Sequence, residues 1–159
     1  VTQSWLIKEK VEGDKIVELS RDIYEPWQKH AISLYRLAES LTFPPIAFFF
    51  RREVMKEIGP FDDELGPLED WEFALRLISR HECPFLEEPL ALYHQREEAV
   101  EGNSANSRLN SREIYGRLDA EIRNRLLRND LARGQLGLGL LVNMGQYHGK
   151  VFLELLKGR

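Results

Sequence analysis

Two neighbouring carboxylates, Glu69 and Asp70, stand at the start of a stretch with helical periodicity and could take part in acid–base chemistry. The residues three, four and seven places after Asp70 are all apolar (Phe73, Ala74 and Leu77). Asp70 therefore lies on the stripe that should face the core, where a carboxylate borders a cleft. The N–H groups and the dipole of a first helical turn favour the ionised carboxylate, which is the form that accepts a proton. A carboxylate in this position could act as a general base.

Acidic residues are also frequent in first helical turns for capping alone, so the spacing by itself favours a structural role for Glu69 and Asp70 over a chemical one. On another face of the predicted helix, Glu69 and Glu72 precede Arg76 by seven and four residues. We expect these three side chains to form a solvated row of ion pairs with no part in chemistry.

The elements that precede this helix begin with a predicted hairpin. Residues 4–11 and 15–19 are rich in β-forming residues and flank the turn-forming sequence Glu12-Gly13-Asp14. Pro26 then suits the start of an amphipathic helix, which we expect to end near Leu41.

A strand and a short helix are predicted next. Pro44 and Pro45 stop the preceding helix, and the continuous apolar run at residues 46–50 predicts a strand covered on both faces inside a mixed sheet. Residues 53–58 predict a short helix, closed by Gly59 in a left-handed cap conformation. Pro60 and Pro67 should stiffen the acidic loop that leads into the helix of Asp70.

Two short strands are expected after that helix, at residues 83–86 and 90–93, on either side of Glu87-Glu88-Pro89. Residues 97–107 are polar and rich in Asn and Ser, which predicts a loop or hinge. A mobile lid over the site is a further option for this segment.

Residues 108–159 have a different character and predict a helical tail. Asn110 and Glu113 resemble a capping box, and apolar residues then recur at helical spacing as far as Leu126. We expect a long helix that ends near Arg133 and is capped by Gly134. Its outer face carries five arginines interspersed with acidic residues: Arg112, Arg117, Arg123, Arg125 and Arg128. A solvated face of mixed charge is expected, and a docking surface for an anionic lipid or polymer is the alternative.

A second tail helix is predicted by a further apolar stripe, although several glycines interrupt it. The stripe consists of Leu136, Leu140, Met144, Val151 and Leu155. Each glycine in a helix interior costs about 1 kcal/mol relative to alanine. Close approach to the first tail helix or across a dimer would compensate, whereas a frayed end is the alternative.

Composition narrows the class of protein. With 159 residues and 43% hydrophobic content, the chain can bury one core and an appended helical unit. A net charge of −4 argues against nucleic acid as the principal partner. The single cysteine, Cys83, rules out an internal disulfide and fits a reducing compartment, and no apolar run is long enough to span a bilayer. We expect a cytoplasmic location, with peripheral attachment at the membrane face as a further option.

Four runs, at residues 48–54, 58–65, 69–77 and 88–93, resemble in order and spacing the C-terminal, acceptor-binding half of family 2 glycosyltransferases of the GT-A fold. The resemblance covers residues 43–96 well and the chain beyond residue 108 hardly at all. It implies an α/β chain in which residues 1–107 form a partial GT-A-like mixed sheet with flanking helices, followed by a C-terminal helical tail at residues 108–159.

The resemblance implies an inverting displacement, in which a base deprotonates an acceptor hydroxyl that attacks the anomeric carbon of a nucleotide-activated sugar. By similarity, Asp70 takes the role of the base and Glu69 assists or orients the acceptor. Trp71 could offer a ring face to a sugar, although packing in the core is the alternative. The resemblance also implies that Asp62 and Asp63 belong to the acceptor-binding loop. The acceptor could be a glycan, a lipid-linked molecule or a protein.

The sequence also departs from the family. Family members bind the donor's diphosphate through a divalent cation, Mg or Mn, held by an Asp-x-Asp motif in an N-terminal half, and this chain has no such motif in the corresponding place. We therefore expect a piece of a longer polypeptide that is inactive by itself. Where the family often shows Tyr-Arg-x-His, this chain has Tyr93-His94-Gln95-Arg96. His94 or Arg96 could reach the metal or the diphosphate, and a merely solvated histidine is the alternative.

A second hypothesis belongs to another functional class. The chain could be a non-catalytic binding or assembly module that keeps the GT-A scaffold, with the acidic helix start retained for structure. In that case the C-terminal helices would mediate association, for example in a homodimer.

Overall fold

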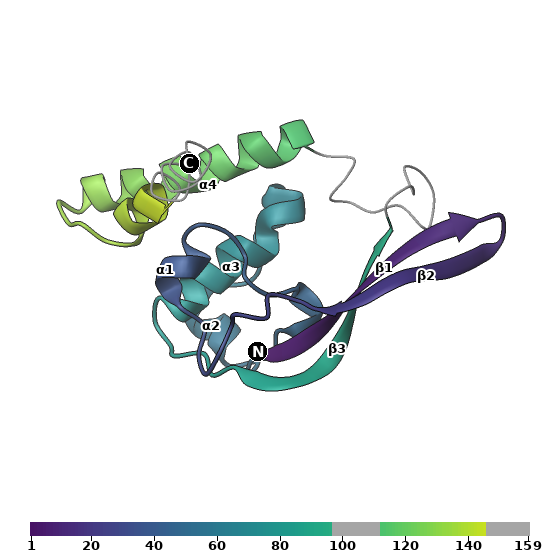
Figure 1. The fold of residues 1–159 in the computed structure, drawn as a ribbon. Coiled ribbons are helices and arrows are strands. Elements are labelled where there is room, and N and C mark those ends of the chain that lie inside the picture. Colours follow the sequence, from purple (N-terminus) through teal and green to yellow (C-terminus); the bar gives the residue numbers. More distant parts are fainter. Residues whose placement is uncertain (97–111, 146–159) are drawn as a thin grey trace, which may run out of the picture.

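The computed structural model describes residues 1–96 and 112–145 as a mixed α/β structure built on a three-stranded sheet (Figure 1). The strands are β1 (Thr2–Glu12), β2 (Lys15–Ile23) and β3 (Leu86–Arg96). Their order is β2-β1-β3, with β1 antiparallel to β2 and parallel to β3. The predicted α/β class with a mixed sheet is confirmed.

The predicted hairpin is also confirmed. β1 and β2 are joined by a two-residue turn, and Gly13 in that turn has a φ of +61°, a conformation that glycine adopts at little steric cost. The second strand is longer than predicted and continues to Ile23. Figure 1 shows the tip of the hairpin projecting away from the helices.

A single strand, β3, replaces the two short strands predicted around Pro89. Its register with β1 shifts between Thr2 and Gln3 and again between Gln3 and Ser4, where Gln3 pairs with Pro89. Proline has no N–H group to donate to a ladder. The chain therefore passes Pro89 through irregular pairing and continues in the same strand.

The helix predicted from Pro26 to Leu41 is wrong in most of its length, since only α1 (Leu34–Leu37) forms there. The backbone of the preceding residues pairs with a distant segment. The Ile32 N–H donates to the Cys83 carbonyl at 2.9 Å, and the Phe85 N–H donates to the His30 carbonyl at 2.8 Å. These long-range hydrogen bonds satisfy the groups that a longer helix would have used.

The strand predicted at residues 46–50 is absent, because a 3₁₀ turn, η1 (Pro45–Ala47), begins at its start. Proline suits the first position of such a turn. Phe48 and Phe50 then pack against Phe73, with ring centroids 6.3 and 4.9 Å away, respectively. The predicted cover on both faces is also wrong, because Ile46 is 57% and Phe49 is 66% exposed while Phe48 and Phe50 pack on a helix.

The segment that leads to Asp70 largely follows the prediction. α2 (Val54–Ile58) ends at Gly59, whose φ of 88° is positive as expected, but whose ψ of 167° lies outside the left-handed helical region that we predicted. The 3₁₀ segment η2 (Asp63–Leu68) follows, with Gly66 in a non-helical conformation. The helix α3 (Glu69–Ile78) then begins at the expected residue.

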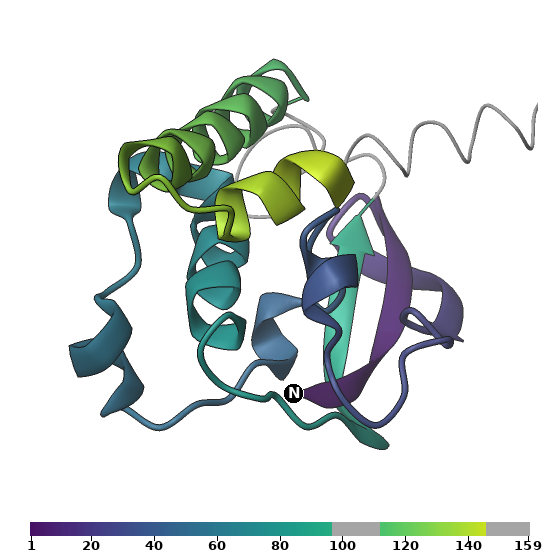
Figure 2. The same cartoon turned by 90° about the vertical axis from the view of Figure 1, so that its left-hand side faces the viewer.

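The helical tail packs on the rest of the described chain. α4 (Arg112–Ala132) ends where predicted, and Gly134 beyond it has a φ of +63°. Residues 138–145 form a second helix whose start is capped by Asp130, because one carboxylate oxygen accepts the N–H groups of Gly137 and Leu140. Figures 1 and 2 show α4 and this second helix side by side.

The second tail helix is confirmed at residues 138–145, but the apolar stripe predicted for it is wrong at two of its residues. Leu136 is 81% exposed and Met144 is 46% exposed, whereas Val142 is fully buried. The predicted close approach between the two tail helices is confirmed at Gly139, where an added Cβ would lie 2.3 Å from the backbone of Leu126. Asn110, the polar segment at residues 97–107, Val151 and Leu155 lie outside the described residues.

Side chains from the first part of the chain and from the tail share one core. The most deeply buried of them are Leu37, Phe43, Trp71, Phe73, Leu75, Ile122 and Val142. Apolar residues of α4 therefore complete the core that α1 and α3 begin.

Arg123 lies in this core, which corrects the prediction that it belongs to a solvated outer face. Its side chain is 4% exposed and binds Asp119 on the same helix at 2.9 Å. It also donates to the carbonyl oxygens of Ala38, Glu39 and Val142. A cation at this depth is tolerated because its donors are directed at acceptors.

We predict that Gly139→Ala lowers the free energy of unfolding by roughly 1–3 kcal/mol or more, because its methyl group would overlap the backbone of Leu126. Gly116→Ala in α4 is the matched control. A Cβ there meets nothing within 4 Å among the described residues, so the exchange should stabilise the protein by roughly 0.5–1 kcal/mol. Urea denaturation measures both effects, and equal stabilities would contradict the helix packing.

We predict that Arg123→Met costs about 3–5 kcal/mol of stability, because it leaves Asp119 and three backbone carbonyls without their donor. Arg117→Met on the same helix is the control, since Arg117 is 69% exposed and lies 3.7 Å from Glu121. That exchange should cost no more than about 1 kcal/mol. Thermal or urea unfolding of the two variants decides whether α4 is anchored through Arg123.

Candidate functional site

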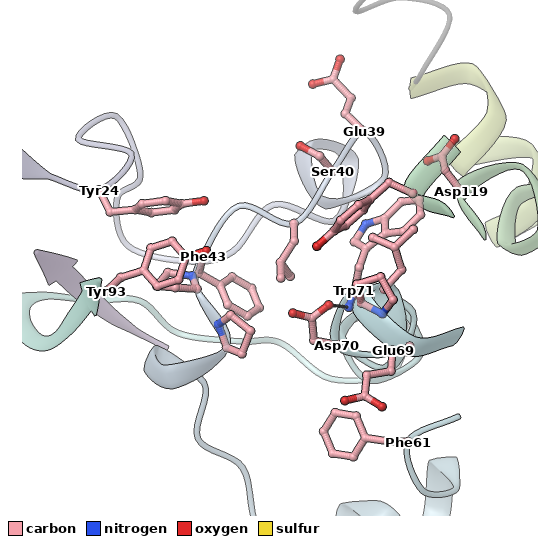
Figure 3. A pocket seen from close by; sticks show the side chains of 17 residues that line it. Tyr24, Glu39, Ser40, Phe43, Phe61, Glu69, Asp70, Trp71, Tyr93 and Asp119 are labelled. Carbon is pink, nitrogen blue, oxygen red and sulfur yellow. Dashed lines mark hydrogen bonds between the residues drawn. The ribbon is translucent and has the colours of Figure 1, made fainter. Parts of the chain in front are cut away.

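A pocket of about 640 Å³ opens where the start of α3 meets the end of β2, β3, α4 and the segment after α1 (Figure 3). The volume lies in the range usual for small-molecule sites. The pocket is lined by aromatic, proline and acidic residues together with a few others: Tyr24, Glu39, Ser40, Leu41, Phe43, Pro44, Pro45, Phe61, Gly66, Pro67, Leu68, Glu69, Asp70, Trp71, Tyr93, Tyr115 and Asp119.

Asp70 lies in the wall of this pocket, as its place on the helix predicted. Its Oδ1 atom accepts the backbone N–H of Trp71 at 2.6 Å. Figure 3 shows the rest of the carboxylate directed into the pocket, toward the side where Phe43 lies. No side chain of the described residues donates a hydrogen bond to this carboxylate. Part of it is therefore available to a bound molecule.

Burial raises the pKa of Asp70 above its ordinary value, and the negative charge of Glu69 raises it further. The backbone N–H groups of Trp71 and of Asp70 itself act in the opposite direction and lower the pKa. The sequence predicted that the first turn would favour the ionised form, and this prediction is wrong in its net direction. Desolvation outweighs the N–H groups, so Asp70 is a stronger base than an ordinary aspartate.

Glu69 and Trp71 flank Asp70 in different environments. The Glu69 carboxylate points toward Phe61 at another part of the pocket wall (Figure 3). Trp71 is only 2% exposed, its indole N–H donates to the Leu37 carbonyl at 2.7 Å, and the guanidinium of Arg123 lies 4.9 Å from the ring centroid. These contacts match the core-packing interpretation of Trp71 and leave little ring surface for a sugar.

The structure places Asp62 and Asp63 outside the pocket lining. Asp62 caps η2 by accepting the N–H of Glu64 at 3.2 Å, and Arg125 donates to its other oxygen at 2.7 Å. The hydrogen bond from Arg125 holds the pKa of Asp62 below its usual value. Asp63 is exposed in the first turn of η2. Asp62 thus holds the loop in place, in contrast to the acceptor contact expected for it.

Glu72 is not a solvated bystander, which corrects the sequence-based expectation. It is 5% exposed and forms an ion pair with Arg76 at 2.8 Å. Arg125 of α4 lies 3.4 Å from the same carboxylate. Arg76 also donates to the carbonyl oxygens of Ile58 and Pro60. The pair therefore fastens the loop that carries Phe61 into the pocket wall.

His94 and Arg96 do not line the pocket, and both are bound to Glu9 of β1. Nδ1 of His94 lies 2.6 Å from one oxygen of Glu9, and Nε of Arg96 lies 3.2 Å from the other. Glu9 is 6% exposed. A guanidinium beside the only carboxylate of this group makes it unsuitable for a divalent cation. Among residues 1–96 and 112–145, no group of three or more His, Cys, Asp or Glu side chains could hold a metal ion.

Sequence reasoning missed several residues of the pocket, namely Tyr24, Glu39, Phe43, Tyr115 and Asp119. They come from the end of β2, the loop after α1, and α4, so no local spacing connects them with Asp70. Tyr93 belongs to one of the family-like runs, but a role near the donor was predicted only for its neighbours His94 and Arg96. Only the tertiary packing of these segments around the start of α3 brings the side chains together.

No helix in the described part of the chain combines the length and apolar character that crossing a membrane requires. Comparison with known proteins found no matching family model, no similar curated protein and no similar solved structure. The site is therefore interpreted from its own geometry and from the pattern of the sequence.

We predict that Asp70→Asn becomes more stable than the unaltered chain as pH rises. The pKa of Asp70 is about 3.9 in the unfolded chain and is raised in the folded protein. The folded protein therefore holds this proton more tightly than the unfolded chain does. Its contribution to stability is therefore present below that unfolded pKa and is lost as pH rises through the folded pKa. Asparagine does not titrate, and its oxygen can still accept the Trp71 N–H.

Melting temperatures of both proteins, measured from acidic to neutral pH, test this difference. Glu64→Gln is the control, because Glu64 is exposed in the same loop. A variant curve that stays parallel to that of the unaltered chain would show that Asp70 titrates as an ordinary surface carboxylate.

Proposed function

We propose that this chain is the acceptor-binding portion of a nucleotide-sugar-dependent, inverting glycosyltransferase, with Asp70 as the general base. The observation that carries the proposal is the Asp70 carboxylate, which lies partly free in the wall of a pocket large enough for a sugar. The resemblance of residues 43–96 to the acceptor half of the GT-A fold supports the same assignment. The mixed sheet would then belong to that fold, although residues 46–50 lack the strand expected in it.

The residues of the pocket suit the chemistry. An acceptor hydroxyl held beside Asp70 would give its proton to the carboxylate while its oxygen bonds to the anomeric carbon and the nucleotide leaves. A base with a raised pKa draws this proton more strongly than an ordinary aspartate. The aromatic rings and prolines of the wall would exclude water from the acceptor.

Donor binding is assigned to no residue of this chain. The family implies a Mg or Mn ion on the donor's diphosphate, but the His94, Arg96 and Glu9 cluster does not fit a cation. The groups that hold the donor would then lie outside the residues that the structure describes. The proposed role of this chain is therefore confined to the acceptor.

A non-catalytic binding or assembly module is the second candidate. It is favoured by one specific observation, that His94 and Arg96, the two groups expected near the donor, are both paired with Glu9 of β1. In that case the pocket would bind a ligand without turning it over. The activity of the Asp70 variant separates the two candidates.

We predict that Asp70→Asn lowers sugar transfer by roughly a hundredfold to ten-thousandfold in the longest polypeptide that carries this sequence. Transfer is measured with a panel of nucleotide sugars, with Mg or Mn present, against glycan, lipid-linked and protein acceptors. Glu69→Gln should have a smaller effect, and the exposed Glu64→Gln should leave transfer unchanged. The chain alone should show no transfer.

Turnover of Asp70→Asn close to the normal rate would remove Asp70 from the chemistry. No turnover by the longest polypeptide with any donor, together with ligand binding in the pocket, would favour the binding module.

A further inference from the structure

The described residues that line the pocket around Asp70 are acidic. Four carboxylates are among them, and of these four only Asp119 has an ion-pair partner in the described ranges, Arg123 at 2.9 Å. Glu39, Glu69 and Asp70 have no ion-pair partner within the described ranges, and no Lys, Arg or His side chain of those ranges lines the pocket. When charges of one sign line a cleft whose walls have a low dielectric constant, the electric field is concentrated inside the cleft and acts on a bound molecule.

Aromatic rings form the opposite part of the wall. Tyr24 and Tyr93 meet edge to face, with centroids 5.7 Å apart at an angle of 87°. Figure 3 shows these two rings and Phe43 on the side that Asp70 faces, with Glu39 and Glu69 at separate parts of the rim. Ring faces carry partial negative charge and attract cations, so these walls act in the same direction as the carboxylates.

We propose that the pocket binds an acceptor that carries a protonated primary amine beside its hydroxyl groups, namely an amino sugar. An ammonium group would neutralise part of the excess negative charge and could contact both a carboxylate and a ring face. A phosphorylated or carboxylated acceptor would meet repulsion from three unpaired carboxylates, and a neutral sugar would gain neither interaction.

The choice of a sugar rests on the proposed function, because the reaction requires a hydroxyl within reach of Asp70. A lysine side chain of a protein has the same ammonium group but carries no hydroxyl. The volume of about 640 Å³ also leaves room for a ring with several substituents. The charge of the pocket and the role of Asp70 thus point to the same class of molecule.

Binding of matched probes to the chain tests the inference by calorimetry or by chemical-shift changes at low salt and neutral pH. Glucosamine, glucose and glucose 6-phosphate share one ring and differ in charge, and Nα-acetyl-lysine amide represents a protein ammonium. We expect glucosamine to bind roughly tenfold more tightly than glucose, and glucose 6-phosphate to bind most weakly. The preference for glucosamine should fall as salt is added.

Variants of the rim locate the effect in this pocket. Glu39→Gln and Glu69→Gln should each reduce the preference for glucosamine over glucose severalfold, while Glu64→Gln, outside the pocket, should leave it unchanged. If Glu64→Gln reduced the preference for glucosamine as much as the rim variants do, the preference would come from the overall negative charge of the chain. That result would overturn the inference.

Three other results would also overturn it: glucose binding as tightly as glucosamine, tighter binding of the lysine derivative, or no binding of any probe. These outcomes are independent of the test of the reaction. If transfer to a neutral sugar depended on Asp70, the proposed function would stand, but the inference that the acceptor carries an amine would be rejected. If glucosamine bound selectively but the longest polypeptide showed no transfer, the inference of an amine-bearing ligand would stand and the proposed function would be rejected.

Discussion

The guanidinium of Arg123 is buried where four segments of the chain meet. It binds Asp119 within α4, the carbonyls of Ala38 and Glu39 after α1, and the carbonyl of Val142 in the second tail helix, and it covers the ring of Trp71 on α3. Removing a cation from water is costly unless its donors are all used. Arrangements of α4 that break these contacts are therefore strongly disfavoured, which fixes α4 against α3.

The pocket depends on this placement. Glu39, Trp71 and Asp119 all line it, and each is in direct contact with Arg123. A second arginine of the same helix, Arg125, extends the arrangement by binding Asp62 and lying close to Glu72. The tail is thus part of the site, because two of its arginines set the positions of the loop and the helix start that surround Asp70.

The features that sequence reasoning predicted correctly are those decided by neighbours in the chain. A two-residue turn with Gly13, a helix closed at Gly59 and a helix that begins at Glu69 each follow from local steric and hydrogen-bonding preferences. The location of Asp70 in a pocket wall also followed, since it needs only the periodicity of one helix.

The failures share the opposite cause. His30 and Ile32 form hydrogen bonds with Phe85 and Cys83 where a helix was predicted. Phe48 and Phe50 pack on Phe73, while Phe49 between them is exposed. Arg123 was expected in solvent, and its burial was missed because most of its partners are backbone carbonyls. No sequence pattern shows which carbonyls will face a side chain. The pKa of Asp70 was misjudged for the same reason, as the burial that raises it comes from tertiary packing.

The environment of Asp70 sets two requirements against each other. Burial and the charge of Glu69 make it a stronger base, but they also favour the protonated form, which cannot act as a base. A positive charge on the bound acceptor would shift this balance toward the ionised form, because a nearby cation lowers the pKa of a carboxyl group. In the empty pocket the proton is held more tightly, and an ammonium group in the pocket would release it. The same charge that selects the acceptor would then also bring the base into its active form.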